Sequence, residues 1–302
     1  MRFSIWPSLQ QPWPDVLEIV HHAERTGWDG IWVADHFMGD DGGFGPVTTP
    51  TLEATAALAA LAGLTSRVSL GSLVLSQTYR HPAVLANWAA TVDHVSHGRL
   101  ILGVGAGWQH NEHEQYGISL PSPRDRIDRL CEAVQVLRSL LTQQSTEFDG
   151  RWFTLRSAVC EPKPLQQPLP ILIGGKGDRM LRVVAQLADA WNMWSLPETL
   201  APRVAVLERA CEQAGRDPRE IKRTTQALVM ITDDMTKARR LIETVAPRAA
   251  IAGPTSHIAE VVSRWQELGV DEVIVPDFVL GRGQAKLDAM DAYLEQVVLL
   301  FR

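Results

Sequence analysis

Two titratable residues, Asp35 and His36, directly follow the apolar run Gly-Ile-Trp-Val-Ala at 30–34, and a glycine-rich, acidic stretch without a regular period comes next. Such an apolar run, with its β-branched and aromatic residues, predicts a buried strand. His36 is the best candidate for a general acid or base, because imidazole titrates near neutral pH. Successive strand residues point to opposite faces, so the two side chains need not pair. The open alternative is that Asp35 caps a turn and His36 is a satisfied wall residue.

Two further strand-like runs end in glycine, as "GVGAGW" at 103–108 and as "GGKGD" at 174–178. Glycine lets backbone N–H groups approach an anion, and the N-terminus of a following helix adds positive potential. The spacing fits neither a Walker loop nor a dinucleotide fingerprint. At 174–178 a phosphate site and a plain tight turn both remain open. At 103–108 the alternatives are a flat ring lying on bare backbone, walled by Trp108, and close packing of a helix on a strand.

A metal centre is the competing interpretation of these strand ends. The segment "HNEHE" at 110–114 has metal-like residue types. Oxygen-rich and histidine-rich metal sites need several convergent ligands, however, and the neighbouring strand ends are apolar or glycine. We therefore expect 110–114 to be a solvated, partly helical loop and expect no metal. No nucleophile elbow is present.

Composition restricts the partners and the compartment. The net charge is −6, and no basic run is present, which argues against nucleic acid and against an anionic membrane surface. Cys131, Cys160 and Cys211 lie far apart and are odd in number, so a reducing cytosol fits best. The chain opens on a strand-like run without the features of a signal peptide, and no apolar run is long enough to span a membrane. We expect a cytoplasmic protein.

Strand and helix patterns alternate along the chain. Strands are expected at about 2–6, 30–34, 68–75, 99–104, 171–173, 190–193, 224–231 and 272–275. Helices are expected at about 14–26, 52–64, from 82 onward, and at 124–141, 179–187, 198–214, 236–246, 256–268 and 287–301. A hairpin is expected around Asp149 and Gly150.

This alternation predicts a parallel sheet, because parallel neighbours need helical crossovers. Eight units favour an α/β fold of the closed (β/α)8 type, a TIM barrel, over an open doubly wound sheet. We expect a single domain over 1–302. Irregular segments at 35–50, 107–123 and 276–284 all follow strands, which places these insertions at the C-terminal face. The hairpin follows a helix and should lie at the opposite rim or at the side.

With these strand ends in place, the chain resembles the luciferase-like monooxygenase superfamily, and most closely its branch of oxidoreductases that use the deazaflavin coenzyme F420. The resemblance rests on "AERTGWDGIWVADHF", "RVSLGSLVLSQTYRHPAVLANWAATVDHVSHGRLILGVGAGWQHNEHEQYGI", "EPKPLQQPLPILIGGKGD" and "ADAWN". These stretches cover about residues 1–195 in order, and together they are specific. The last third matches mainly as a barrel pattern.

The resemblance implies a flavin-like ring at the C-terminal mouth of the barrel. It implies a non-prolyl cis peptide at or next to Leu73-Val74, and it makes His36 the ring-side histidine. The residues implied to contact the cofactor are Asp35, Leu73, Val74, Ala106, Gly107, Trp108 and Asn111, with Gly174, Gly175, Lys176 and Gly177 around its phosphate. Two features depart from the family: relatives that oxidise sugars or alcohols often carry a glutamate in place of Trp108, and the Glu-His-His of light-emitting enzymes reads Ala34-Asp35-His36 here.

The function expected from this resemblance is hydride transfer between F420 and a small organic substrate, with His36 as acid or base. Trp6, Trp108, Trp194 and Phe278 should line a largely apolar pocket. One alternative is a monooxygenase that uses reduced FMN, and another is a flavin-binding protein without turnover. A homodimer formed through the barrel helices is compatible with the resemblance.

Overall fold

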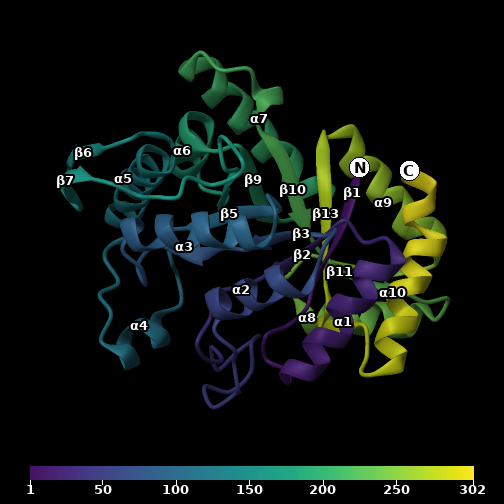
Figure 1. The fold of residues 1–302 in the computed structure, drawn as a ribbon. Helices are drawn as coiled ribbons and strands as arrows, with labels where there is room; N and C mark the ends of the chain where they lie inside the picture. Colours follow the sequence, from purple (N-terminus) through teal and green to yellow (C-terminus); the bar gives the residue numbers. More distant parts are fainter.

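The computed structural model describes residues 1–302 and contains a closed barrel of eight parallel strands surrounded by helices (Figure 1). In order around the barrel the strands are β3 (Ser69–Ser72), β2 (Gly30–Val33), β1 (Arg2–Trp6), β13 (Val270–Pro276), β10 (Lys222–Gln226), β9 (Ala190–Trp194), β8 (Ile171–Gly174) and β5 (Leu100–Gly105). The pairing of β3 with β5 closes the barrel, and the short β4 (Leu75–Ser76) continues β3 along β5. The predicted (β/α)8 barrel is confirmed.

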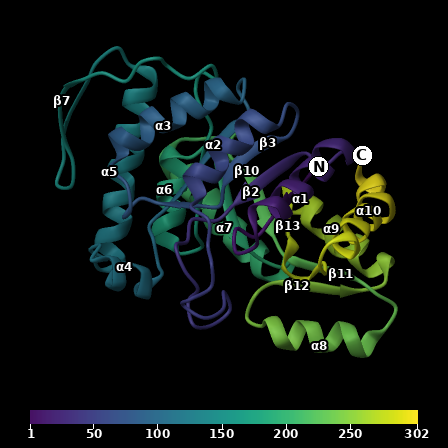
Figure 2. The same cartoon turned by 60° about the horizontal axis from the view of Figure 1, so that its bottom comes forward.

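The helices cover the outside of the barrel in both views (Figures 1 and 2). They are α1 (Trp13–Thr26), α2 (Ala54–Leu64), α3 (Pro82–Val95), α4 (His110–Tyr116), α5 (Pro123–Thr142), α6 (Asp178–Leu187), α7 (Pro197–Ala214), α8 (Met235–Val245), α9 (Thr255–Glu267) and α10 (Gln284–Gln296). Three short 3-10 helices complete the set: η1 (Pro218–Glu220), η2 (Asp277–Val279) and η3 (Val298–Phe301). None of the helices combines the length and the apolarity needed to cross a membrane.

Local sequence explains several of these boundaries. Proline stands in the first turn of α1, α3, α5 and α7, where its missing N–H has no helical partner to lose. Gly27 ends α1 in the left-handed conformation, with φ of 101°, and Gly215 ends α7 in the same way with φ of 68°. Ser122 caps α5, since its hydroxyl accepts the Asp125 N–H.

The barrel interior forms its own small core, separate from the large apolar layer between the strands and the helices. Its members are Trp6, Trp32, Leu73, Leu172, Ala190 and Ile274. Gly71 makes room for one of them, because a Cβ there would lie 2.3 Å from the Trp32 ring. Burying such a side chain stabilises the fold by roughly 1.5–3 kcal/mol. This cluster packs beneath the mouth of the barrel, and its members Trp6 and Leu73 also line the cavity there.

Two predicted strands are each split in the structure. The strand expected at 68–75 is interrupted between β3 and β4. The strand expected at 224–231 becomes β10 and β11 (Leu228–Ile231), and β11 leaves the barrel to pair with β12 (Ala250–Gly253), a strand that the pattern did not predict. The run Ala-Ile-Ala-Gly in β12 is short and rich in small residues, so it carries little strand signal.

The hairpin predicted around Asp149 and Gly150 is present as β6 (Thr146–Asp149) and β7 (Thr154–Ala158), which pair antiparallel. In Figure 2 it projects from the edge of the molecule, on the side away from α8. The excursion from β11 through α8 to β12 lies at the other edge. Its connection from α8 to β12 reaches the barrel mouth, as described below.

Candidate active site

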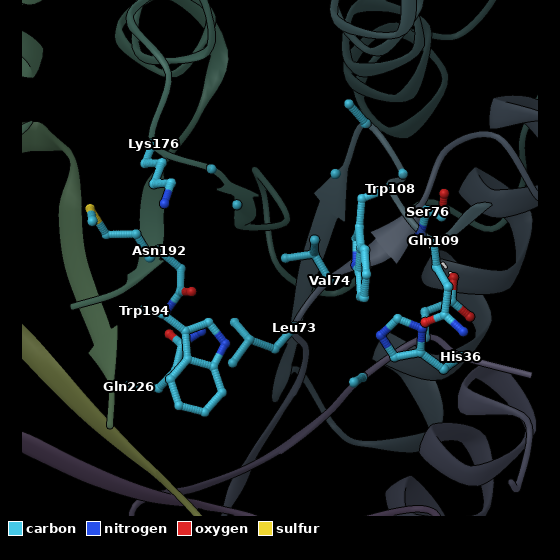
Figure 3. A pocket seen from close by; sticks show the side chains of 18 of the residues that line it. His36, Leu73, Val74, Ser76, Trp108, Gln109, Lys176, Asn192, Trp194 and Gln226 are labelled. Atoms are coloured by element: carbon cyan, nitrogen blue, oxygen red, sulfur yellow. Dashed lines mark hydrogen bonds between the residues drawn. The ribbon is translucent and has the colours of Figure 1, made fainter. Parts of the chain in front are cut away.

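A cavity of about 580 Å³ opens where the barrel strands end. Most of the predicted site residues line it together: Trp6, Asp35, His36, Leu73, Val74, Ala106, Gly107, Trp108, Gly174, Gly175, Lys176 and Trp194. Asn111, Gly177 and Phe278 do not line it. Figure 3 shows Lys176, Asn192, Trp194 and Gln226 on one side and Trp108, Gln109 and His36 on the other, with Leu73 and Val74 between them.

The peptide bond between Leu73 and Val74 is cis, at the position that the family resemblance implied. It separates β3 from β4 and turns the Val74 side chain toward two glycines on neighbouring strands. A Cβ on Gly105 would lie 2.5 Å from one methyl of Val74, and a Cβ on Gly174 would lie 3.1 Å from each of its two methyls. The strand-end glycines therefore make room for the Val74 side chain, which lines the cavity where bare backbone was the expectation.

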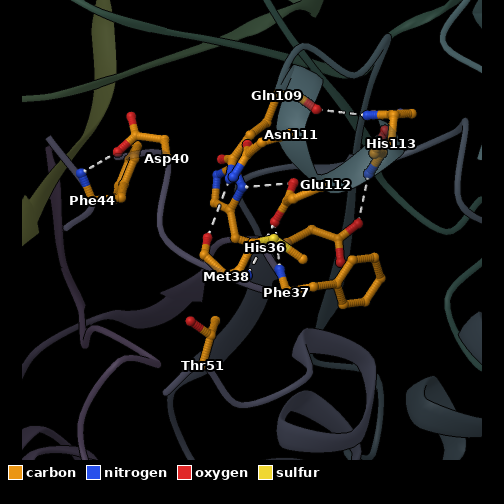
Figure 4. A network of polar contacts seen from close by, with 12 residues as sticks. His36, Phe37, Met38, Asp40, Phe44, Thr51, Gln109, Asn111, Glu112 and His113 are labelled. Carbon is orange, nitrogen blue, oxygen red and sulfur yellow. Dashed lines mark hydrogen bonds and ion pairs between the residues drawn. The ribbon is translucent and has the colours of Figure 1, made fainter. Parts of the chain in front are cut away.

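His36 lies against a buried carboxylate that belongs to α4. Its Nδ1 is 3.3 Å from Oε2 of Glu112 (Figure 4). The Glu112 side chain also accepts the Phe37 N–H at 2.5 Å and the Tyr79 hydroxyl at 2.5 Å. Because an ionised carboxylate can only accept hydrogen bonds, Nδ1 carries the imidazole proton. Nε2 is then the nitrogen that is free to take or give a proton.

The sequence interpretation of "HNEHE" as a solvated, partly helical loop is right about the helix, which is α4, but wrong about solvation at Glu112 and His113. Glu112 is fully buried, and His113 is 2% exposed. The His113 ring bonds to Thr78 Oγ1 and to the Gln109 carbonyl, both at 2.7 Å. All five letters are polar, so composition gave no sign of a buried face. The available signal was position, since the segment follows a barrel strand at the rim that also carries His36.

The environment of Glu112 favours its ionised form. Burial by itself raises its pKa, but the hydrogen bonds from His36, Tyr79 and Phe37 outweigh burial and lower the pKa overall. Burial and the bond to Glu112 raise the pKa of Tyr79, which keeps the phenol protonated. The network thus keeps the negative charge of Glu112 next to Nδ1 of His36.

Glu112→Gln is expected to lower the free energy of unfolding by about 2 kcal/mol at pH 7, because the buried donors lose a charged acceptor. A pKa lowered by folding adds stability above the ordinary glutamate value of about 4.3, and that stability is lost as pH falls through the folded pKa. The difference between variant and wild type should therefore shrink in acid. Urea unfolding from pH 7 to pH 3 measures this, with the exposed Glu114→Gln as control. A pH-independent difference would contradict the assignment.

Asp35 and His36 do not pair, in agreement with the strand geometry. The Asp35 carboxylate accepts hydrogen bonds from Nη1 and Nη2 of Arg80, at 2.6 and 2.9 Å, and from the Ser76 N–H at 2.8 Å. Arg80 also reaches Glu53 at 2.5 Å. These bonds fix the end of β2 against β4. Cofactor contact by Asp35 stays a prediction.

The turn after β8 has the features of an anion cradle. Gly175 has φ of +145°, and a Cβ on it would lie 2.8 Å from Met180, so only glycine fits without strain. Gly177 is the N-cap of α6 and offers no capping side chain, which leaves first-turn N–H groups open. Lys176 is exposed at the cavity edge and makes no ion pair. Free N–H groups, a helix N-terminus and a lysine together suit a phosphate.

Phe278, which the sequence assigns to the pocket, and Asn111, which the family resemblance assigns to the cofactor, have other neighbours than the cavity. Phe278 packs on Trp6 with ring centroids 5.2 Å apart, and Trp6 in turn lies 5.8 Å from Trp194. Asn111 donates to the Gly39 carbonyl at 2.8 Å and so holds the 38–45 segment. The long rim loops determine such details, and their paths do not follow from periodicity.

Several lining residues were missed by the sequence interpretation: Phe44, Tyr79, Gln109, Glu112, Met180, Asn192, Met193, Gln226 and Arg248. Two of them carry a buried acceptor without a partner, Oε1 of Gln109 and Oε1 of Gln226. Buried polar atoms of this kind normally have partners, so they indicate a ligand with polar edges. A flavin or deazaflavin fits the residues present: Val74 for the ring face, amides for ring edges and the glycine turn for phosphate.

Several known proteins are similar to this chain in sequence or in fold. An F420-dependent glucose-6-phosphate dehydrogenase from Kineococcus radiotolerans is 31% identical over 83% of this chain and 75% of its own length. The enzyme of the same name from Amycolatopsis mediterranei is 31% identical over 86% and 78%. Among solved structures, an F420-dependent secondary alcohol dehydrogenase with an F420-acetone adduct superposes with a TM-score of 0.83 at 22% identity, covering 99% of both chains.

A monooxygenase, RslO1 from Streptomyces bottropensis, has the same fold with a TM-score of 0.81 at 18% identity over all of both chains. The model of one protein family, described as luciferase-like monooxygenase, matches residues 1–270. With this match and the barrel mouth described above, the chain belongs to the luciferase-like monooxygenase family and is an oxidoreductase of that class.

Proposed function

We propose that this protein transfers a hydride between coenzyme F420 and a small organic substrate. The observation that supports this most is one cavity lined by the His36 imidazole, by the cis peptide at Leu73-Val74 and by the glycine-rich turn after β8. The relatives named as F420-dependent dehydrogenases, at about 31% identity, favour F420 over other flavins. The substrate of those relatives is not carried over to this chain.

Each residue of the site has a separate role in this reaction. A bound deazaflavin would supply a ring carbon that accepts or gives up a hydride. Val74 would support the face of that ring, and Gly175 with Lys176 would hold the phosphate. His36 takes a proton from the substrate hydroxyl at Nε2 during oxidation, or returns it during reduction. Glu112 fixes the imidazole through Nδ1 and stabilises its positive charge when protonated.

A monooxygenase using reduced FMN is the second candidate, because the matching family model bears that description. The two functions differ in their need for oxygen. We expect the protein to consume no oxygen above the buffer rate when it is supplied with reduced FMN. We also expect anaerobic turnover with F420 and an oxidisable alcohol. Enzyme-dependent oxygen consumption with reduced FMN, and no anaerobic turnover with F420, would reverse this choice.

A further inference from the structure

The cavity contains an imbalance of charge. Both of the carboxylates that line it are already paired, Asp35 with Arg80 and Glu112 with His36. Two cations, Lys176 and Arg248, line the same cavity and take part in no ion pair. The guanidinium of Arg248 makes no side-chain hydrogen bond either. A ligand that enters the cavity therefore meets positive charge without a partner, which favours an anion.

Arg248 is held in place although it lacks an acidic partner. It lies in the connection from α8 to β12, and its guanidinium stacks over the Phe44 ring at 4.5 Å. Gly43 covers the guanidinium so closely that a Cβ there would lie 2.0 Å from Nη2. The charge of Asp40 acts on Arg248, but the Asp40 carboxylate accepts hydrogen bonds from the N–H groups of Gly42 and Phe44 and forms no ion pair with Arg248. The cation is thus partly desolvated and preorganised.

Burial lowers the pKa of Arg248, and Asp40 opposes this. An arginine in a protein keeps its proton at neutral pH even so. The charge is therefore present under any condition in which the protein is folded and active.

The position of Arg248 relative to His36 separates it from the anion cradle. The Phe44 ring centroid lies 4.5 Å from the Arg248 guanidinium and 5.1 Å from the centroid of the His36 ring. Both groups therefore pack against the same aromatic ring. Lys176, by contrast, stands across the cavity from His36, beyond Leu73 and Val74 (Figure 3). Lys176 thus lies with the glycine turn, whereas Arg248 shares the Phe44 ring with His36.

We propose that Arg248 binds an anionic group of the substrate, a carboxylate or a phosphate, while the reacting carbon lies beside His36. This proposal rests on the proposed hydride transfer. A planar guanidinium donates two parallel hydrogen bonds to either group, which fixes orientation as well as charge. Under the proposed function the cofactor phosphate would lie at Lys176, which leaves Arg248 for an anionic group of the substrate.

The test measures binding to protein saturated with F420, so that the cradle is filled. Calorimetric titrations use two matched pairs: glucose 6-phosphate against glucose, and lactate against 2-propanol. Wild type should bind at least one anion more tightly than its neutral partner. Arg248→Met should weaken that binding by roughly 10- to 100-fold. Arg248→Lys, which keeps the charge, should lie in between. Arg240→Met, an exposed arginine on α8, is the matched control and should bind as wild type.

The results also separate phosphate from carboxylate as the anion, according to which pair shows the preference. Equal binding of anionic and neutral partners would overturn the proposal, and so would anion binding that Arg248→Met leaves unchanged. Weaker F420 affinity in Arg248→Met, without an effect on substrate, would move Arg248 to the cofactor and also overturn it. The initial saturation step tests the proposed function separately, because that function fails if F420 does not bind.

Discussion

His36→Ala is expected to lower kcat by roughly 10²- to 10⁴-fold while the affinity for F420 stays within a few-fold of wild type. The reason is that His36 is the cavity residue whose Nε2 is left free to exchange a proton, since Glu112 holds Nδ1. The imidazole lies across the cavity from Lys176 and the glycine turn, so the phosphate contacts remain (Figure 3). Steady-state turnover with the preferred alcohol of the wild type, together with a fluorescence titration of F420, measures both quantities.

His110→Ala is the control for this change, because His110 is exposed at the start of α4 and does not line the cavity. It should behave as wild type in both assays. Equal turnover by His36→Ala and His110→Ala would remove His36 from the chemistry. Tight F420 binding by a wild type that turns over no substrate would support the third reading, a flavin-binding protein without activity.

Gly175→Asp should abolish measurable cofactor binding, and Gly175→Ala should weaken binding by roughly 10- to 100-fold. Both variants place a Cβ at φ of +145° and 2.8 Å from Met180, which displaces the turn that holds the phosphate. The aspartate also brings a negative charge to an anion cradle. Equilibrium titration of each variant with F420 gives the two dissociation constants.

Gly63→Asp adds the same atoms and charge at an exposed site in α2, where a Cβ would meet only ordinary contact with Val95 at 3.8 Å. It should bind cofactor normally. Thermal unfolding of the free proteins shows whether Gly175→Ala is folded. A folded Gly175→Asp that binds F420 as tightly as wild type would contradict the phosphate assignment.

The barrel itself was predictable because alternating strand and helix patterns carry strong periodic signals. The split at Leu73-Val74 does not follow from periodicity, since the residues on both sides read as one apolar run. Resemblance to a family located it instead. The same limit applies to β10 and β11, where a continuous run over 224–231 leaves the barrel after Gln226. Hydrophobic pattern predicts burial but not which neighbour a strand pairs with.

The residues of the candidate site likewise fall into a predictable group and an unpredictable group. Residues at strand ends, such as His36 and Lys176, were predictable because the topology brings all strand ends to one face. Glu112, Gln226 and Arg248 were not, since their positions depend on how α4, the end of β10 and the connection after α8 fold back over the mouth. The partners of His36 became visible only when those segments were placed in three dimensions.

The proposed function depends above all on the binding of F420 in preference to FMN. Purified wild-type protein is titrated separately with F420 and with FMN, and the fluorescence of each cofactor is followed to saturation. We predict saturable F420 binding at one site per chain, with FMN at least about tenfold weaker, equivalent to 1.4 kcal/mol. Tight binding of FMN without any response to F420 would contradict F420 as the cofactor of this protein.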